Sequence, residues 1–164
     1  MKPAAERVQA AIAGHGLERR VIELPVHART SQQAADALGV AIGQIVKSLV
    51  FTADGRPILV AASGANRVDE RRLGELVGGR VRRADPETVK QATGYTIGGV
   101  PPLGLPGDLP VYVDRDLLGH ELVYAAGGLP ECVFPITPDE LVRATGGSVV
   151  DVKETVRDGK GGPA

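Results

Sequence analysis

The sequence predicts a mixed α/β domain in which peripheral helices surround a mixed, partly curled, barrel-like β-sheet. Its 164 residues match the usual size of one domain. Gly (22 residues) and Pro (12 residues) interrupt the apolar runs throughout, which favours many short elements joined by tight turns. Strands and helices do not alternate at the long spacing of a doubly wound sheet. We therefore expect one domain over residues 1–156 and a flexible tail over residues 157–164.

Local signals place helices and strands in the first part of the chain. Apolar residues recur at helical spacing between Ala4 and Ala13, and Thr30 with Gln33 forms the pattern of a capping box. The Asp54-Gly55 pair between two apolar runs is typical of a hairpin turn. The expected elements are a helix over residues 4–13, a strand over 21–24, a helix from 30 to 38, a helical turn leading into a strand over 42–51, and a strand over 57–62.

Helix-start signals and short apolar runs define the remaining elements. Val68, Leu73 and Leu76 are separated by charged residues, and the Asp85-Pro86 pair is typical of a helix start. The expected elements are a helix over residues 67–76, a helix from 86 to about 94, strands over 95–97, 109–113, 121–126 and 132–136, a capped helix over 138–144, and a strand over 148–152.

Composition excludes several classes of protein. The formal charge of −1 argues against a general nucleic-acid coat and against a polybasic membrane module, although a local basic face is compatible with it. The single cysteine, Cys132, excludes an internal disulfide framework and a CxxC metal or redox site. No apolar run approaches the length of a membrane span, and the N-terminus has no uninterrupted apolar region. We expect a cytoplasmic protein with no cofactor, no metal, and neither membrane nor DNA as a partner.

The motifs of several common enzyme classes are absent from the sequence. The chain contains no GxGxxG after a strand, no GxxxxGK[ST], no HExxH and no GxSxG. His15, His27 and His120 lie in three separate predicted loops or element ends, which argues against a three-histidine metal site. Cys132 follows the apolar alternation of a strand, where a free cysteine usually acts as a small hydrophobic residue.

Lys47 is the first candidate functional residue, because it lies within the apolar segment IVKSLVF. Burying an ammonium group costs free energy unless an anion or hydrogen-bond acceptors surround it. One interpretation places Lys47 on the polar side of an edge strand, with its stem extending towards solvent. The other directs its ammonium group into a cleft, where it would bind phosphate or ester oxygens. The sequence leaves both interpretations open.

The loop GGVPPLGLPG, at residues 98–107, is the second candidate. It can neither continue a helix nor pair fully in a sheet. Adjacent glycines, Gly98 and Gly99, allow backbone N–H groups to approach a ligand closely and to converge on an oxyanion. The alternative is an ordinary rigid turn.

Five segments, taken in order, resemble the YbaK/prolyl-tRNA synthetase-associated domain family. They are IVKSLVF, PILVAASGANRVD, GGVPPLG, VYVDRDLL and ELVYAAGG with FPITPDELVRATGG, and the resemblance extends over about residues 21–152. It implies a compact mixed α/β domain, related to the editing insertion of bacterial prolyl-tRNA synthetases, that hydrolyses mischarged aminoacyl-tRNA in trans.

The same resemblance implies roles for individual residues. Lys47 corresponds to the essential lysine of the family, and Gly98, Gly99 and Pro102 match its glycine-rich loop. Some relatives have a histidine near the final strands, which this chain lacks. Further matches are Asp114 at an acidic position in the strand after the loop, and Gly127 and Gly128 in a loop at the pocket mouth.

The expected reaction is the attack of water on the ester that joins an amino acid to the terminal ribose of tRNA. Lys47 would position a terminal phosphate or the ester, and the N–H groups of Gly98 and Gly99 would stabilise the oxyanion. Because no general base is visible, we expect a ribose hydroxyl of the substrate to assist the water. Aliphatic residues are expected to line a pocket for a small amino acid: Val26, Val46, Leu49, Ala61 and Val100.

A basic segment over residues 67–83 is a candidate site for the phosphates of an acceptor stem. It contains three acidic residues and six arginines: Arg67, Arg71, Arg72, Arg80, Arg82 and Arg83. The alternative is a solvated helix face whose charges pair within the helix.

The leading prediction is an aminoacyl-tRNA deacylase that removes a small non-cognate amino acid, with tRNA for proline as the expected carrier. An aminoacyl-tRNA synthetase is a second candidate partner. One alternative is a module that binds a tRNA end or a small ligand without hydrolysis. A carboxylester hydrolase of small metabolites is less well supported, because the sequence contains no nucleophile motif.

Overall fold

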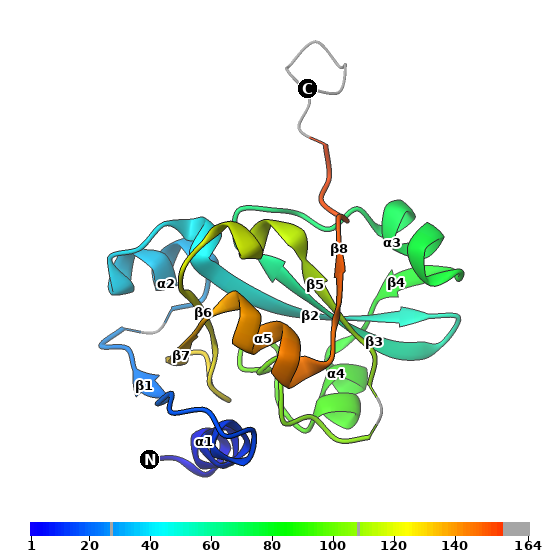
Figure 1. Ribbon diagram of the computed structural model, residues 1–164. Helices are drawn as coiled ribbons and strands as arrows, with labels where there is room; N and C mark the ends of the chain where they lie inside the picture. The colour runs from blue at the N-terminus through cyan, green and yellow to red at the C-terminus, as the bar shows by residue number, and fades with distance from the viewer. Residues whose placement is uncertain (27, 108, 156–164) are drawn as a thin grey trace.

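One mixed sheet forms the centre of a mixed α/β domain, and five helices surround it in the part of the chain that the structure describes (Figure 1). A computed structural model describes residues 1–26, 28–107 and 109–155. The sheet combines parallel and antiparallel pairs, so the predicted fold class is confirmed. The tail predicted over residues 157–164 lies outside the described residues.

The helices and strands follow one another along the chain in short segments. They are α1 (Pro3–Gly14), β1 (Ile22–Glu23), α2 (Ser31–Leu38), the 3-10 helix η1 (Ile42–Gln44), β2 (Ile45–Ala53), β3 (Arg56–Ser63), α3 (Glu70–Val77), β4 (Val81–Arg83), α4 (Pro86–Thr93), β5 (Val111–Asp114), the 3-10 helix η2 (Arg115–Gly119), β6 (Val123–Ala126), β7 (Cys132–Ile136), α5 (Pro138–Thr145) and β8 (Ser148–Val150). Within the described ranges, none of these helices is long and apolar enough to cross a lipid bilayer.

Strand β2 has a central place in the sheet, whose order is β1-β7-β6-β2-β3-β5-β8. The hairpin partner β3 pairs along one edge of β2, from Val46 to Ala53. The other edge is shared, because parallel β6 pairs with Ile45 and Val46 whereas antiparallel β4 pairs with residues 51–53. Between these two partners, no described strand pairs with residues 47–49 on that edge.

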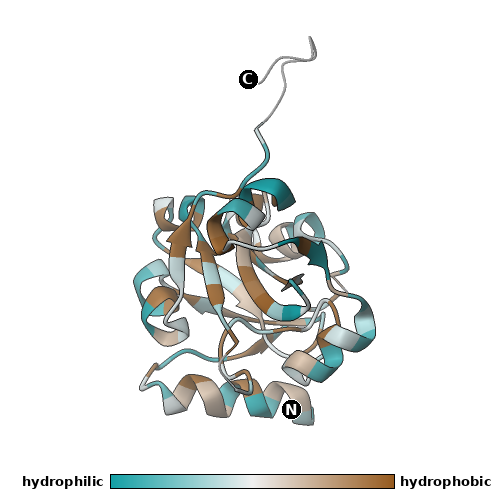
Figure 2. Cartoon of the chain, turned by 90° about the vertical axis from the view of Figure 1, so that its right-hand side faces the viewer, coloured by the Kyte–Doolittle hydropathy of each residue, from teal (hydrophilic) through white to brown (hydrophobic). Residues whose placement is uncertain are grey.

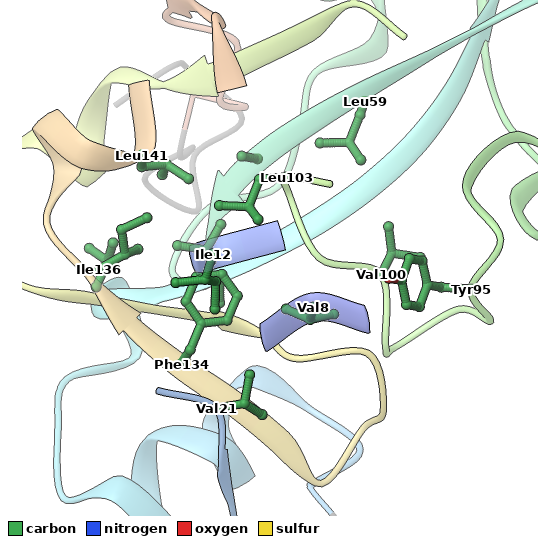
Figure 3. Packing of buried hydrophobic residues seen from close by; sticks show 14 of the residues in the cluster. Val8, Ile12, Val21, Leu59, Tyr95, Val100, Leu103, Phe134, Ile136 and Leu141 are labelled. Carbon is green, nitrogen blue, oxygen red and sulfur yellow. The ribbon is translucent and has the colours of Figure 1, made fainter. Parts of the chain in front are cut away.

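The two faces of the sheet are covered by different helices. Val46 and Val50 of β2 belong to the main core, together with residues of α1, α4 and α5. Figure 3 shows part of this core, including Val8 and Ile12 of α1 and Leu141 of α5. Residues of the opposite face pack against α2 and α3. Figure 2 shows the matching hydropathy, with the strands largely hydrophobic and the helices alternating between hydrophobic and hydrophilic residues. The period-two alternation along β2 therefore decides which side chains join the main core.

Three expectations about individual elements need correction. The strand predicted over residues 95–97 is absent, because the Thr93 hydroxyl bonds both the N–H and the carbonyl of Tyr95. The helix predicted from residue 67 begins at Glu70, since the Asp69 carboxylate caps the N–H groups of Arg71 and Arg72. The short elements β4 and η2 were not predicted.

Gly128 joins three segments through backbone contacts. It has a φ of +100°, and a Cβ at this position would lie 2.6 Å from the carbonyl oxygen of Ala4 in α1. A Cβ on Gly99 would in turn lie 2.6 Å from the carbonyl oxygen of Gly128. The start of α1, the turn between β6 and β7, and the loop around Gly99 are therefore packed against one another without intervening side chains.

Replacing Gly128 by Ala should destabilise the fold more than the same change at another glycine with positive φ. Gly146 has a φ of +64° and no neighbouring atom within 4 Å of an added Cβ. Gly146→Ala should therefore cost only the left-handed conformation, about 1–2 kcal/mol. Gly128→Ala should cost about 1–3 kcal/mol more, because its Cβ also overpacks the contact. Urea unfolding of both variants measures the difference, and equal losses would contradict this packing.

Candidate functional site

A pocket of about 280 Å³ opens at the shared edge of β2. Lys47, Ser48 and Leu49, the residues without a strand partner on this edge, all contribute to its wall. The other walls come from the start of α2, the ends of β6 and β7, and the loop over residues 97–100. The pocket therefore lies where the sheet is interrupted. A wider hollow of about 770 Å³, at the far end of the β2–β3 hairpin, contains none of the predicted site residues.

Lys47 points into this pocket from the centre of the sheet. β2 is not an edge strand, because it has partners on both sides, although neither partner on the shared edge pairs with Lys47. The side chain is half-buried, and its Nζ donates a hydrogen bond to the carbonyl oxygen of Asn66 at 2.6 Å. Within the described residues, no other acceptor bonds this ammonium group. Two of its three N–H donors are therefore available to a ligand.

The surroundings of Lys47 are electropositive. Burial lowers the pKa of Lys47 below its usual value, and the nearby guanidinium groups of Arg83 and Arg67 lower it further, whereas Asp114 opposes the shift. Arg29 and the N-terminus of α2 also line the pocket, and no acidic side chain is found among its described lining residues. An anion in the pocket would relieve this repulsion.

The register of the sheet brings Arg83 to Lys47. Arg83 in β4 is paired directly opposite Phe51, and Phe51 lies on the same face of β2 as Lys47. The guanidinium carbon of Arg83 lies 5.5 Å from the centre of the Phe51 ring. Arg67 follows the turn after β3 and is exposed. These two of the six predicted arginines are therefore near the pocket.

The other four arginines have different surroundings. Arg71 forms an exposed ion pair with Glu75 at 3.4 Å, one helical turn away, as the solvated-helix alternative predicts. Arg72 bonds Asp151 and the carbonyl oxygen of Lys153. Arg80 and Arg82 are exposed near and within β4. In the part of the chain that the structure describes, no contact of these four groups connects them to the pocket.

The sequence left open whether the loop of Gly98 is an ordinary rigid turn or presents N–H groups to a ligand, and the structure has features of both. The Gly99 N–H donates to the carbonyl oxygen of Thr96 at 3.0 Å, so this donor is already used within a turn. Gly98 has a φ of +93°, as the third residue of a type II turn requires, and it lines the pocket. No acceptor for the Gly98 N–H is found among the described residues. Gly98 is therefore the candidate oxyanion donor, and Gly99 shapes the turn.

Asp114 does not line the pocket but lies behind it. Its side chain is buried at 2% exposure and accepts hydrogen bonds from the Ser63 N–H at 3.0 Å and the Asn66 amide at 2.9 Å. The Asp116 N–H donates to its other oxygen at 3.0 Å. Asp114 therefore holds the turn that presents the Asn66 carbonyl to Lys47.

The predicted aliphatic residues divide into two groups. Val46, Leu49 and Val100 line the pocket. Val26 is 53% exposed and borders a separate hollow, and Ala61 is fully buried in β3. Pro102, Gly127 and Gly128 are buried outside the pocket wall.

Sequence reasoning missed several residues of the pocket. Asn66 was not predicted; it lies outside the pocket wall and bonds Lys47 through its backbone carbonyl. Ser48 has a buried Oγ without a hydrogen-bond partner in the described part of the chain. The lining residues that the sequence did not indicate are Ala28, Arg29, Thr30, Ser31, Ala34, Ile45, Ser48, Ile97, Tyr124, Ala126, Pro130, Cys132 and Val133.

Among the described residues, histidines and acidic groups do not gather at this site. A Cβ on Gly43 would lie 3.2 Å from Nε2 of His120, whose ring is outside the pocket wall, and His27 lies outside the described residues. A search of the described residues finds no group of three His, Cys, Asp or Glu side chains placed to hold a metal ion.

Comparison with protein families identifies one match. The model of the aminoacyl-tRNA editing domain matches residues 26–144. The chain is 36% identical to the uncharacterized protein YwhH of Bacillus subtilis over 125 residues, which cover 76% of this chain and 80% of YwhH. It is also 36% identical to the proline–tRNA ligase of Nitratidesulfovibrio vulgaris (strain DP4) over 93 residues, which are 56% of this chain but only 16% of the ligase.

Solved structures show the same fold over nearly the whole chain. A crystal structure described as that of a proposed trans-editing enzyme for prolyl-tRNA synthetase superimposes with a TM-score of 0.90 and 48% identity, covering 94% of this chain and 99% of that one. The hypothetical protein APE2540 superimposes with a TM-score of 0.84 and 38% identity, covering 90% of this chain and 99% of that one.

Removing the charge of Arg83 should raise the pKa of Lys47. A neighbouring positive charge disfavours the protonated lysine, so Arg83→Gln should shift the titration of Lys47 to higher pH. The ¹³Cε resonance of Lys47, followed by NMR as pH rises, measures this shift. Arg143→Gln, in α5, is the matched control, because Arg143 is not among the groups that perturb Lys47. An unchanged or lower pKa in Arg83→Gln would contradict the assigned repulsion.

Proposed function

Because the chain belongs to the aminoacyl-tRNA editing domain family, we propose that it is an aminoacyl-tRNA deacylase that hydrolyses the ester of mischarged tRNA in trans. The single observation that carries this proposal is the half-buried Lys47, which lines the same pocket as Gly98, a pocket without described acidic side chains. The likeness to prolyl-tRNA ligases supports tRNA for proline as the carrier, and prolyl-tRNA synthetase as a partner.

In this proposal, Lys47 binds the phosphate next to the terminal adenosine. Its ammonium group has two free donors, and a phosphate would offset the repulsion from Arg67 and Arg83. Both arginines are exposed, so they can contact further phosphates of the single-stranded acceptor end. Lys47, Arg67 and Arg83 repel one another in the free protein. In the complex each would contact a phosphate, and the loss of this repulsion favours binding.

The amino acid is proposed to occupy the apolar part of the pocket. Val46, Leu49 and Val100 contribute to its wall, and its volume of about 280 Å³ has room for a small side chain together with the ester. Aliphatic walls discriminate by roughly 10- to 200-fold per methylene group, so contacts with the tRNA contribute to selection.

The proposed reaction needs no covalent intermediate. Water adds to the ester carbonyl carbon, the Gly98 N–H stabilises the oxygen that becomes negative, and the bond to the ribose oxygen breaks. The ribose oxygen leaves with a proton, which gives a free amino acid and uncharged tRNA. Since the described lining residues include no carboxylate and no imidazole, we assign the activation of water to the neighbouring ribose hydroxyl of the substrate.

A second candidate function is binding of a charged tRNA end without hydrolysis. The observation that favours it is the Gly99 N–H, which is already bonded to Thr96 and leaves one loop donor in place of two. Removal of one such donor from a known oxyanion hole lowers turnover by about 10²–10³-fold, so the number of donors affects the rate strongly.

Deacylation of a panel of mischarged tRNAs tests the proposed function. The native protein should release a small non-cognate amino acid, and Lys47→Ala should slow this release by about 10²-fold or more, because the phosphate is no longer held in place. Lys90→Ala is the matched control, since the Lys90 ammonium bonds Gly94 on the exposed surface of α4.

The outcomes separate the two candidate functions. If the native protein binds charged tRNA but hydrolyses none of the panel, the binding module is correct. Full activity in Lys47→Ala would remove the role assigned to this lysine.

The salt dependence of tRNA binding tests the two arginines. Each phosphate contact with a single strand contributes about −0.7 to the slope of log K against log salt concentration. Arg67→Gln and Arg83→Gln should each make the slope shallower by about 0.7. Arg71→Gln should leave it unchanged, because Arg71 pairs with Glu75 on the solvated face of α3. If Arg71→Gln made the slope shallower and Arg83→Gln did not, the tRNA would contact the solvated face of α3 and not Arg83, which would contradict this proposal.

A further inference from the structure

A chain of hydrogen bonds leads from the pocket to the C-terminal segment of the protein. Lys47 donates to the carbonyl oxygen of Asn66 at 2.6 Å, and the Asn66 amide donates to Asp114 and to Asp116, each at 2.9 Å. Lys153 then donates to the same Asp116 oxygen at 2.8 Å. We call these five residues the lysine relay.

The turn that carries Asn66 has little freedom to move. The Gly64 N–H bonds the carbonyl oxygen of Ile45 at 2.7 Å, and a Cβ on Gly64 would lie 2.6 Å from the carbonyl oxygen of Ile42. The Asn66 N–H bonds the Ser63 carbonyl oxygen at 3.0 Å. The first part of the turn is thus fixed by the backbone, and the Asn66 amide fixes its last residue.

Residues 151–154, which we call the C-terminal strap, hold Lys153 in place. The Glu154 N–H bonds the carbonyl oxygen of Arg67 at 2.8 Å, and Lys153 forms a β-bridge with Val68. Val152 is buried against α3. The editing-domain model matches residues only up to 144, so the strap lies beyond the matched part of the chain.

We propose that Asn66 and Lys153 are positioning residues for Lys47, and that the lysine relay directs the Lys47 ammonium group into the pocket. This inference rests on the proposed function for its catalytic consequence, but not for its structural one. The relay adds a role for the C-terminal strap, which makes no contact with the pocket itself.

The charges around Lys47 explain why such positioning is needed. Arg83 of β4 and the nearby Arg67 repel the ammonium group, and Arg29 lines the same pocket. On the attractive side, Asp114 of β5 lies behind the turn, and the Asn66 carbonyl accepts a hydrogen bond that favours the charged form. A carbonyl held by the relay therefore favours the charged form of Lys47 and fixes the direction of its ammonium group.

Stability alone does not account for the outer part of the relay. The side chains of Lys153 and Asp116 are 42% and 36% exposed, and ion pairs of this kind contribute little to the free energy of unfolding. Loss of this ion pair should therefore change the pKa of Lys47 while leaving the melting temperature nearly unchanged.

NMR titration of Lys47 in the free protein tests the relay without any activity measurement. Asn66→Ala should lower the pKa of Lys47, because the carbonyl acceptor is no longer held against the ammonium group. Lys153→Met should lower it for the same reason, since Lys153 is not among the charges that perturb Lys47 directly and acts on it only through Asp116 and Asn66. Lys153→Arg should restore the native value. Arg115→Ala is the control, because it removes an ion pair to Asp151 of the same strap at 3.0 Å but is not a member of the relay. An unchanged pKa in both Asn66→Ala and Lys153→Met would overturn the proposal.

Steady-state deacylation then separates positioning from binding. Lys153→Met should lower kcat by about three- to tenfold with KM within about twofold of the native value, because geometry and not affinity is lost. Arg115→Ala should change neither constant, and an equal loss of kcat in this control would overturn the catalytic role of the relay. If the native protein hydrolyses no charged tRNA, the proposed function fails, and the NMR titration still decides the structural relay.

Discussion

The candidate site depends on the division of one edge of β2 between two strands. β6 pairs with its first two residues and β4 with its last three, and the interval between them exposes the backbone of residues 47–49 to the pocket. An interruption of strand pairing in the middle of a sheet costs free energy unless the unpaired N–H and C=O groups find other partners. Here the loop of Gly98 and the start of α2 complete the wall. The interruption is therefore what allows a lysine from a central strand to line the pocket.

Elements with local causes were predictable from the sequence, and elements with distant causes were not. The capping side chains of Thr30, Asp85 and Thr137 lie within three residues of the N–H groups that they bind, so the helix starts could be recognised. In contrast, the polar segment Val81–Arg83 becomes a strand only because the free end of the β2 edge pairs with it. The apolar run at Tyr95 is diverted by a threonine side chain.

The same division applies to the candidate site. Lys47 could be singled out because a charge within an apolar strand needs an explanation, and Gly98 because adjacent glycines permit close approach. To recognise that Arg83, of the six arginines, lies near Lys47, one must know how β4 pairs with β2, and the composition of the segment does not reveal this pairing. Asn66 was missed because it presents a main-chain oxygen to Lys47, and every residue type carries that oxygen.

The backbone contact between α1 and Gly128 has a consequence for how amino-acid selectivity can change. The first helix contacts the turn of Gly128, this turn contacts Gly99, and Gly99 is followed by Val100 in the pocket wall. A small displacement of α1 is therefore transmitted to the pocket through two rigid main-chain contacts. Divergence of the N-terminal helix among relatives can retune the depth of the pocket while all its lining residues stay the same.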